Sequence, residues 1–349
     1  MKRKGIGALV IVPLLSIIIS FLIGCIVIAA LGANPVDAMR YLLKGSFGNV
    51  RNLGTTFSRA TPLIFTTLCA CFAYRCGVFN LGGEGQFIIG AIIACYIATK
   101  APFTGFPAIL LCAVAGAAGG GLWAAIAGVL KVWRGQNEMI ITIMLNYVAT
   151  LLMGVVYTNW LRDGSVPQTV AVPDETQLPS FFGLRATVAF PVAVIAGIAI
   201  FYFLFYTSSG FQLRAVGLNM TAAKVNGFNV KRYLLMSFIV SGAIAGLGGA
   251  LELLGTQLRL INGFAAGYGF DGVAMALIAS LHPIAGIVVA IFFAALRVGS
   301  TTMQTATGVP TSVSDIIQAL VIVFTVAGMA MVKLPEFKNR FARRARKEA

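Results

Sequence analysis

Two glycine-rich segments of the sequence each place an acidic residue directly before a short apolar block. The first segment, GVFNLGGEGQ, covers residues 77–86, and the second, GFAAGYGFDG, covers residues 263–272. Glycine-interrupted backbone is tolerated at membrane depth only where protein or water satisfies its polar groups, and pairs of such segments often mark a substrate path. The polar residues expected to line such a path are Asn80, Glu84, Gln86, Asn146 and Asp271.

Glu84 differs from the other acids because it lies between two glycines, where an acid has no packing role. A charged side chain near the centre of a bilayer costs roughly 2.5–3.5 kcal/mol, so it must face protein or water. Glu84 is therefore expected either to start the next helix, whose positive N-terminus favours an acid, or to hold the unwound segment by accepting backbone hydrogen bonds. If Glu84 holds the unwound segment by accepting backbone hydrogen bonds, Asn80 is the residue that we expect to face the substrate. Glu138, which precedes another apolar run, is interpreted as a first-turn acid.

The sequence holds no pattern of an enzyme or of a metal site. It contains no G-x-x-x-x-G-K-[ST] phosphate loop, no H-E-x-x-H, no serine elbow and no carboxylate pair with a nearby histidine. The single histidine, His282, precedes a proline and is interpreted as a break between two short helices, with a proton relay as the alternative. The six cysteines lack metal-binding or redox spacing and are interpreted as small apolar residues. We therefore expect no catalysis, cofactor or metal on this chain, and ATP-driven transport would need an ATPase on another chain.

The composition excludes a soluble globular protein. Of the 349 residues, 58% are hydrophobic and 11% are charged, and the mean hydropathy is +0.90. Soluble domains carry roughly 25% charged residues. The N-terminal apolar block, about residues 8–31, is longer than the roughly 7–15 residues of a signal-peptide core, so it is expected to remain as a first membrane span.

Ten apolar blocks predict an all-α polytopic membrane protein with about ten transmembrane helices, some of them short or broken. The two blocks beside His282-Pro283 are short enough to form one kinked helix instead, but an even number of crossings places both basic ends of the chain on one side. Because nothing is left for a soluble domain, residues 1–349 are expected to form a single membrane domain. The ten blocks are 8–31, 58–74, 86–99, 106–130, 139–160, 187–206, 234–254, 269–281, 283–297 and 313–332.

The basic residues indicate which side of the membrane each loop faces. The net charge of +15 comes from Lys and Arg residues that lie between and after the apolar blocks, not in one stripe, which argues against nucleic acid as a partner. In the ten-span topology, 17 of the 26 Lys and Arg residues are cytoplasmic. They include those of the N-terminus (1–7), of the loops at 131–138 and 207–233, and of the tail (333–349). Outer loops are expected at about 32–57, 100–105, 161–186, 255–268 and 298–312.

The cytoplasmic loop at 207–233 has the properties of a docking helix. It combines small residues, among them Ala222 and Ala223, with flanking Arg and Lys and with Gly227, which would end a helix. We expect a short surface helix that docks into a groove of another protein. A helix lying on the lipid surface is the alternative, although the apolar residues of this loop do not form a wide stripe.

At these residues the sequence resembles permease subunits of bacterial ABC importers, in the branch for simple sugars, branched-chain amino acids and nucleosides. The first glycine-rich segment is similar to the asparagine-glycine-acid-glycine-glutamine signature of the nucleoside and simple-sugar group. LRAVGLN at 213–219, followed by AAKVNG at 222–227, is similar to the ATPase-coupling loop of importer permeases, although Thr221 stands where the family usually has an acid. Blocks at 137–147, 241–255 and 269–279 resemble the family as well, so the resemblance covers roughly residues 55–335.

The resemblance implies a complex of two permease and two ATPase subunits that is fed by an extracytoplasmic substrate-binding protein, a lipoprotein in Gram-positive bacteria. This chain would be one permease in the bacterial cell membrane, paired with a homologous or identical second permease and without a cofactor of its own. We refer to residues 207–233 as the coupling loop. Its expected ATPase contact comprises Arg214, Gly217, Asn219, Ala222, Ala223 and Gly227, with the two alanines packed against the partner and Gly227 ending the helix.

The few charges along the expected path favour a neutral substrate. A nucleoside is expected within the branch that the sequence resembles, and a simple sugar is the alternative. An ion-coupled secondary transporter is the hypothesis from a different class of protein.

Overall fold

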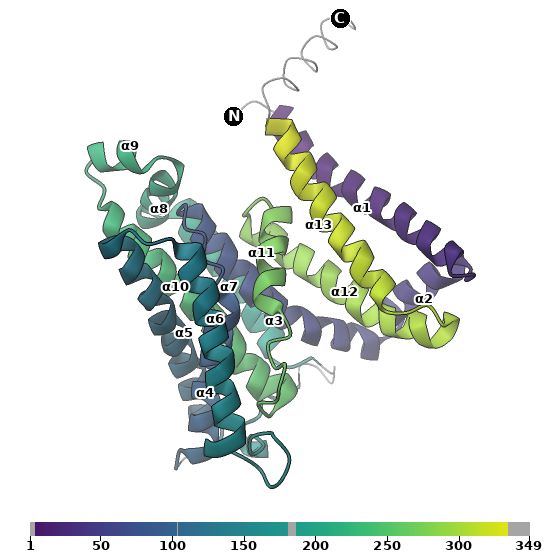
Figure 1. Cartoon of the computed structure of the whole chain (residues 1–349), viewed down its shortest axis with the longest axis horizontal. Helices are drawn as coiled ribbons and strands as arrows, with labels where there is room; N and C mark the ends of the chain where they lie inside the picture. The colour runs from purple at the N-terminus through teal and green to yellow at the C-terminus, as the bar shows by residue number, and fades with distance from the viewer. Residues whose placement is uncertain (1–3, 103, 181–185, 334–349) are drawn as a thin grey trace, which may run out of the picture. The chain divides into compact units, whose positions relative to one another are not determined.

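The computed structural model describes residues 4–102, 104–180 and 186–333, and these residues form an all-helical fold (Figure 1). The all-α class expected from the sequence is confirmed. Besides the α-helices, the described residues form π-helical turns at Val156–Trp160 and Leu253–Gln257 and a 3-10 turn at Asp174–Thr176. The α-helices are α1 (Lys4–Ala30), α2 (Pro35–Phe47), α3 (Val50–Arg75), α4 (Gly83–Lys100), α5 (Phe106–Arg134), α6 (Glu138–Val155), α7 (Ala189–Tyr206), α8 (Ser208–Leu218), α9 (Met220–Val225), α10 (Val230–Glu252), α11 (Tyr268–Ile278), α12 (Pro283–Thr307) and α13 (Ser312–Lys333).

Each of the ten apolar blocks is helical, and the chain is a multi-pass membrane protein. Among the described residues, seven helices are long and apolar enough to cross a membrane, namely α1, α5, α6, α7, α10, α12 and α13. Helices α3 and α4 have 26 and 18 residues but carry more polar side chains. Helix α11 has 11 residues, which corresponds to about 16 Å, roughly half of the hydrocarbon core. It is one of the short helices that the sequence predicted, and a total of ten crossings stays a prediction.

Two expected outer loops are instead largely helical, so those boundaries were wrong. Helix α2 lies inside the expected loop at 32–57. Asn34 caps it by accepting a hydrogen bond from the Val36 N–H (3.0 Å), and Pro35 occupies its first position. Helix α12 continues through the expected loop at 298–312 as far as Thr307. Both stretches mix polar with apolar residues, so the sequence analysis did not identify them as apolar blocks.

The residue contacts divide the chain into two compact units. One unit combines the described residues up to Asn52 with those from Ala295 to Lys333. In this unit α1 packs along α13, where a Cβ at Gly24 would lie 2.5 Å from the Ile317 side chain. Ser46 of α2 donates a hydrogen bond to the Ala295 carbonyl oxygen. The single membrane domain expected over residues 1–349 stays a prediction.

The other unit, Leu53–Ala294, contains both glycine-rich segments and the coupling loop. Its centre is formed by α4, α5 and α10, which lie side by side in Figure 1. Glycines let these helices approach closely: a Cβ at Gly90 would lie 2.2 Å from the Gly246 carbonyl oxygen, and one at Gly246 would lie 2.4 Å from the Gly116 carbonyl oxygen. Small residues at helix crossings are the usual means of close packing in membranes. The first glycine-rich segment (77–86) leads directly into α4, one of these closely packed helices.

Candidate functional site

Polar residues of the first glycine-rich segment form a buried hydrogen-bond cluster with α10. Asn80 Nδ2 donates to Gln86 Oε1 (3.1 Å), and Gln86 Nε2 donates to Asn80 Oδ1 (3.0 Å). Asn80 Nδ2 also donates to Ser241 Oγ (3.0 Å), and Asn80 Oδ1 accepts from the Gly82 N–H (2.9 Å). Asn80 and Gln86 are each 1% exposed. In this structure the amide cluster, defined as Asn80, Gln86 and Ser241, therefore bonds within itself and does not face an open path, and a contact of Asn80 with substrate stays a prediction.

Two residues of α6 hold the backbone of the same segment. Asn146 Oδ1 accepts from the Gly85 N–H (2.8 Å), and Asn146 Nδ2 donates to the Leu81 carbonyl oxygen (2.9 Å). Thr142 Oγ1 accepts from the Leu81 N–H (3.3 Å). Only glycine fits at position 85, since a Cβ would lie 2.9 Å from Asn146 Oδ1. The structure thus brings Asn146 to the expected site and adds Thr142, which the sequence analysis missed.

Glu84 joins the two glycine-rich segments. Its Oε1 accepts from the Gly267 N–H (2.9 Å), and its Oε2 accepts from the Gly269 N–H (2.7 Å). Glu84 lies in the first turn of α4, and Gly267 is the residue that caps α11, so one carboxylate lies at the N-terminal ends of two helices. The expectation that Glu84 accepts backbone hydrogen bonds is confirmed. The bonded backbone, however, belongs to the second glycine-rich segment and not to the first.

The second glycine-rich segment lies close to α3 and α4. A Cβ at Gly269 would lie 2.2 Å from the Glu84 backbone nitrogen, and one at Gly272 would lie 2.5 Å from Thr66 Oγ1. Asp271 is half-buried in the first turn of α11. The residues that the sequence assigned to a path, from both segments and from α6, are therefore gathered in one unit of the chain.

The coupling loop forms two short helices, α8 and α9, that are separated at Asn219. Asn219 has an extended backbone, and its Oδ1 accepts from the Ala222 N–H (3.0 Å) to cap α9. Helix α9 ends at Val225, after which Gly227 takes a left-handed conformation (φ 80°) and the Phe228 N–H donates to the Ala223 carbonyl oxygen. The predicted helix end at Gly227 is confirmed.

The two faces of the coupling loop differ sharply. Leu218 and Val225 are 88% and 84% exposed, and Asn219, Ala222 and Gly227 are exposed as well. Ala223 is 3% exposed, so the expectation that it packs against a partner does not hold, because α9 turns this residue toward the interior of its own chain. The surface available to a partner is therefore the outward face of the loop.

Arg214 and Gly217 also point into their own chain. The Arg214 guanidinium lies 4.9 Å from the centroid of the Phe205 ring on α7. A Cβ at Gly217 would lie 2.2 Å from the Arg75 carbonyl oxygen, so α8 packs directly on the end of α3. These two residues position the loop and are not part of its exposed face.

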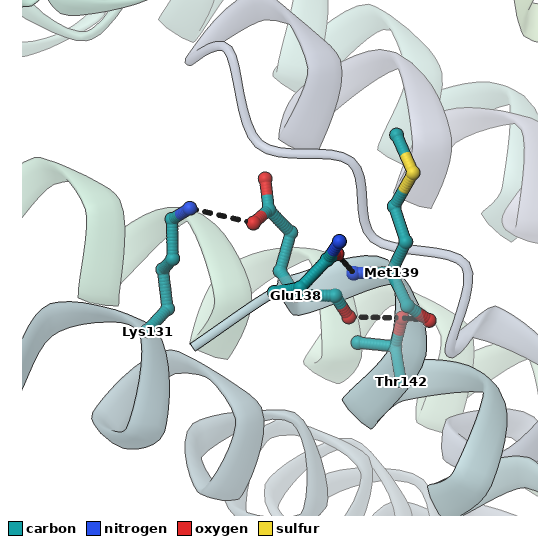
Figure 2. A network of polar contacts seen from close by, with 5 residues as sticks. Lys131, Glu138, Met139 and Thr142 are labelled. Carbon is teal, nitrogen blue, oxygen red and sulfur yellow. Dashed lines mark hydrogen bonds and ion pairs between the residues drawn. The ribbon is translucent and has the colours of Figure 1, made fainter. Parts of the chain in front are cut away.

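The junction between α5 and α6 is fixed by a salt bridge, which Figure 2 shows at close range. Lys131 Nζ lies 2.7 Å from Glu138 Oε2, and both side chains are partly buried. Asn137 caps α6 by accepting from the Met139 N–H (3.0 Å), while Thr142 Oγ1 donates to the Glu138 carbonyl oxygen (2.7 Å). Glu138 is thus the first-turn acid that the sequence predicted. The junction orients α6, which carries Thr142 and Asn146 to the first glycine-rich segment.

Comparison with known proteins gives one family and several relatives of nearly full length. The model of the family described as branched-chain amino acid transport system / permease component matches residues 52–326. The guanosine ABC transporter permease protein NupP of Bacillus subtilis is 32% identical, over 92% of this chain and 94% of NupP. The nucleoside ABC transporter permease protein NupB of Lactococcus lactis is 31% identical over 97% of each chain, and the glucose ABC transporter permease protein TsgB13 of Haloferax volcanii is 31% identical over 90% of this chain and 86% of TsgB13. No solved structure matches the chain.

Proposed function

We propose that this chain, which belongs to the permease family of the branched-chain amino acid transport system type, imports nucleosides as the membrane subunit of an ATP-driven transporter. Membership of the family means that the chain is an ABC permease and is not itself catalytic, and it implies ATPase and binding-protein partners. The hypothesis of an ion-coupled secondary transporter is therefore set aside. The observation that carries the nucleoside proposal is that relatives named for guanosine and nucleosides match over at least nine-tenths of the chain.

The polar chemistry around the two glycine-rich segments supports a neutral substrate. The amide cluster and Asn146 are uncharged, and the Glu84 carboxylate is satisfied by two backbone N–H groups. A nucleoside is neutral, so it needs no counter-ion along such a path. In this proposal both segments border the path, and the five residues expected there (Asn80, Glu84, Gln86, Asn146, Asp271) shape it chiefly by holding the segments in place.

The proposal assigns the ATPase to the outward face of the coupling loop. Large exposed apolar side chains such as Leu218 and Val225 are typical of surfaces that a partner covers. The same assignment places both termini and residues 131–138 in the cytoplasm and residues 161–186 outside, in agreement with the distribution of Lys and Arg. A second permease, homologous or identical, and an extracytoplasmic substrate-binding lipoprotein complete the proposed complex in the bacterial cell membrane.

A simple sugar is the second candidate substrate. The glucose permease of Haloferax volcanii matches this chain about as well as the nucleoside permeases do. Sugars are neutral as well, so the charges of the path do not separate the two classes. Substrate choice is instead made first at the binding protein, which is where it can be measured.

The substrate proposal is tested on the purified binding protein that associates with this permease. Its thermal unfolding is followed with guanosine, uridine, glucose and ribose added in turn. We expect the nucleosides to raise the unfolding temperature, more so the higher their affinity, and the two sugars to leave it unchanged. Stabilisation by a sugar alone would replace nucleoside import by sugar import.

The ATPase assignment is tested by charging the exposed face of the coupling loop. Val225→Glu should reduce the amount of ATPase that copurifies with the permease several-fold, because a carboxylate would be buried in an apolar contact. Val166→Glu is the matched control, since Val166 is 53% exposed and lies in the loop proposed to face outside. Equal copurification of ATPase with both variants would remove the coupling loop from this contact and favour the lipid-surface alternative.

A further inference from the structure

Helix α11 is held by charged side chains at both of its ends. Glu84 binds the N–H groups at its start, as described above. At its other end, Arg75 Nε donates to the Leu281 carbonyl oxygen (2.9 Å), and an Arg75 terminal nitrogen donates to the Ser280 carbonyl oxygen (3.2 Å). Arg75 lies two residues before the first glycine-rich segment, and Glu84 lies near the end of that segment, so residues from one short stretch of chain hold the two ends of α11.

The turn held by Arg75 has a backbone that seldom persists without support. Ser280 and Leu281 both have positive φ, at 51° and 59°. Left-handed backbone is uncommon in residues other than glycine and is kept only where surrounding contacts impose it. The two hydrogen bonds from Arg75 are such contacts, so the conformation at the end of α11 depends on where the guanidinium lies.

The same guanidinium also contacts the aromatic ring that holds Arg214 of the coupling loop. The Arg75 and Arg214 guanidinium carbons lie 5.4 and 4.9 Å from the centroid of the Phe205 ring. Both distances are within the range of a cation–π interaction. Arg214 Nε is buried and makes no hydrogen bond among the described residues, while the guanidinium keeps its contact with the ring. We call Arg75, Phe205 and Arg214 the arginine–phenylalanine cluster.

The cluster thus connects three elements through direct contacts. Arg214 lies on α8, Phe205 on α7 and Arg75 at the end of α3, from where its hydrogen bonds reach the end of α11. Helix α8 also touches the Arg75 backbone at Gly217. A shift of α8 would therefore change the surroundings of Arg75 directly.

We infer that Arg75 and Phe205 are positioning residues that transmit movement of the coupling loop to α11 and so to the proposed substrate path. This inference rests on the proposed contact between the coupling loop and the ATPase. It predicts that loss of either residue separates ATP hydrolysis from transport, because the ATPase still docks but α11 no longer follows. A purely structural role would instead lower hydrolysis and transport together.

The first test measures the ratio of guanosine taken up to ATP hydrolysed, in proteoliposomes that hold the complete complex. Phe205→Leu removes the ring but keeps an apolar side chain, and Arg75→Gln removes the guanidinium. Loss of one cation–π contact corresponds to a fall in the ratio of roughly 2- to 30-fold. Each variant should lower the ratio by at least that much, because Phe205→Leu removes two such contacts and Arg75→Gln removes one together with two hydrogen bonds. The double variant should fall no further than the worse single variant, because both act through one connection. Phe190→Leu is the matched control: Phe190 lies on the same helix, α7, and its ring stacks on that of Phe57 (4.4 Å between centroids), so this variant should keep the wild-type ratio.

The second test does not depend on the identity of the substrate. Hydrogen exchange of the peptide covering residues 267–283 is compared with and without a non-hydrolysable ATP analogue, in complexes that contain equal amounts of ATPase. In the wild type the analogue should change the exchange of this peptide, and in Phe205→Leu the change should be lost. If Phe205→Leu fails to assemble, Arg75→Lys takes its place, because lysine keeps the charge but cannot bind both carbonyl oxygens in the same geometry.

The outcomes separate this inference from the proposed function. Failure of the wild-type complex to take up guanosine contradicts the nucleoside proposal, and the exchange measurement then still tests the connection. A wild-type ratio and a wild-type exchange response in Phe205→Leu and Arg75→Gln would overturn the inference. Multiplied effects in the double variant would overturn it as well, since they would show that the two residues act independently.

Discussion

Replacing Glu84 with glutamine separates the charge of this side chain from its shape. The carboxylate accepts hydrogen bonds from the Gly267 and Gly269 N–H groups at 2.9 and 2.7 Å and is half-buried. Glutamine has the same length, so the packing of Glu84 against α11 should be preserved. Glutamine has only one oxygen, however, and its amide nitrogen is a donor that would face a backbone donor.

The size of the effect follows from these two bonds. A hydrogen bond to a charged group contributes about 1.5–3 kcal/mol and a neutral one about 0.5–1.5 kcal/mol, while an unpaired buried N–H costs about 1–3 kcal/mol. One bond in Glu84→Gln is weakened and the other is lost. We therefore expect the free energy of unfolding to fall by about 2–4 kcal/mol, with the loss concentrated at the start of α11.

Thermal unfolding of the purified complex in detergent measures this loss, and hydrogen exchange of residues 263–272 locates it. Glu175→Gln is the matched control, because it makes the same chemical change at an exposed carboxylate in the turn at Asp174–Thr176, where a surface substitution changes stability by about 0.5 kcal/mol or less. Glu84→Gln should unfold at a clearly lower temperature than Glu175→Gln and should show faster exchange at Gly267 and Gly269. Equal unfolding temperatures and unchanged exchange would refute the reasoning that Glu84 holds α11.

Three further predictions concern packing, the amide cluster and topology. Gly246→Ala should lower the free energy of unfolding by about 1–3 kcal/mol through overpacking, because its Cβ would lie 2.4 Å from the Gly116 carbonyl oxygen. The yield of folded protein on size exclusion should fall accordingly. Gly154→Ala is the control and should behave as wild type, since the nearest neighbour of its Cβ would lie at 3.9 Å. Asn80→Ala should lower the unfolding temperature, since it leaves the buried Gly82 N–H and Gln86 Nε2 without their acceptor at about 1–3 kcal/mol each. An unchanged unfolding temperature would contradict this structural role and favour the expectation that Asn80 faces the substrate. In a cysteine-free background, Ser165→Cys and Lys224→Cys, both at exposed positions, should respond oppositely to an impermeant thiol reagent on intact cells, and equal labelling would contradict the proposed orientation.

Most helices could be predicted from the sequence because membrane spans are apolar along their whole length. That criterion finds α1 and α5 at once, but it misses α2, which buries only residues such as Ala38 and Leu42 on one face. It also stops α12 too early, because the last turns of that helix contain Thr301, Thr302 and Gln304. Helical structure in such stretches depends on caps and on tertiary contacts more than on apolarity.

The two glycine-rich segments could be recognised from their glycines and acids, but their connection could not. Glu84 bonds to backbone groups more than 180 residues away, and nothing in the spacing of one segment encodes that contact. The sequence also could not predict that Ala223 faces the interior of its own chain, since small residues occur in interiors as well as in interfaces. From the sequence, Arg75 could be interpreted only as a basic residue that sets topology, because its role depends on the fold that brings α3 to the end of α11.

Uptake by the reconstituted complex tests the central claim most directly. The permease is placed in proteoliposomes with its partner permease, its ATPase subunits and its binding protein, and radiolabelled guanosine and glucose are supplied separately. The account predicts that guanosine accumulates only when ATP is present on the side of the coupling loop, and that unlabelled glucose does not compete. ATP-dependent accumulation of glucose without guanosine would contradict nucleoside import, and guanosine uptake that needs no ATP would contradict the ATP-driven mechanism.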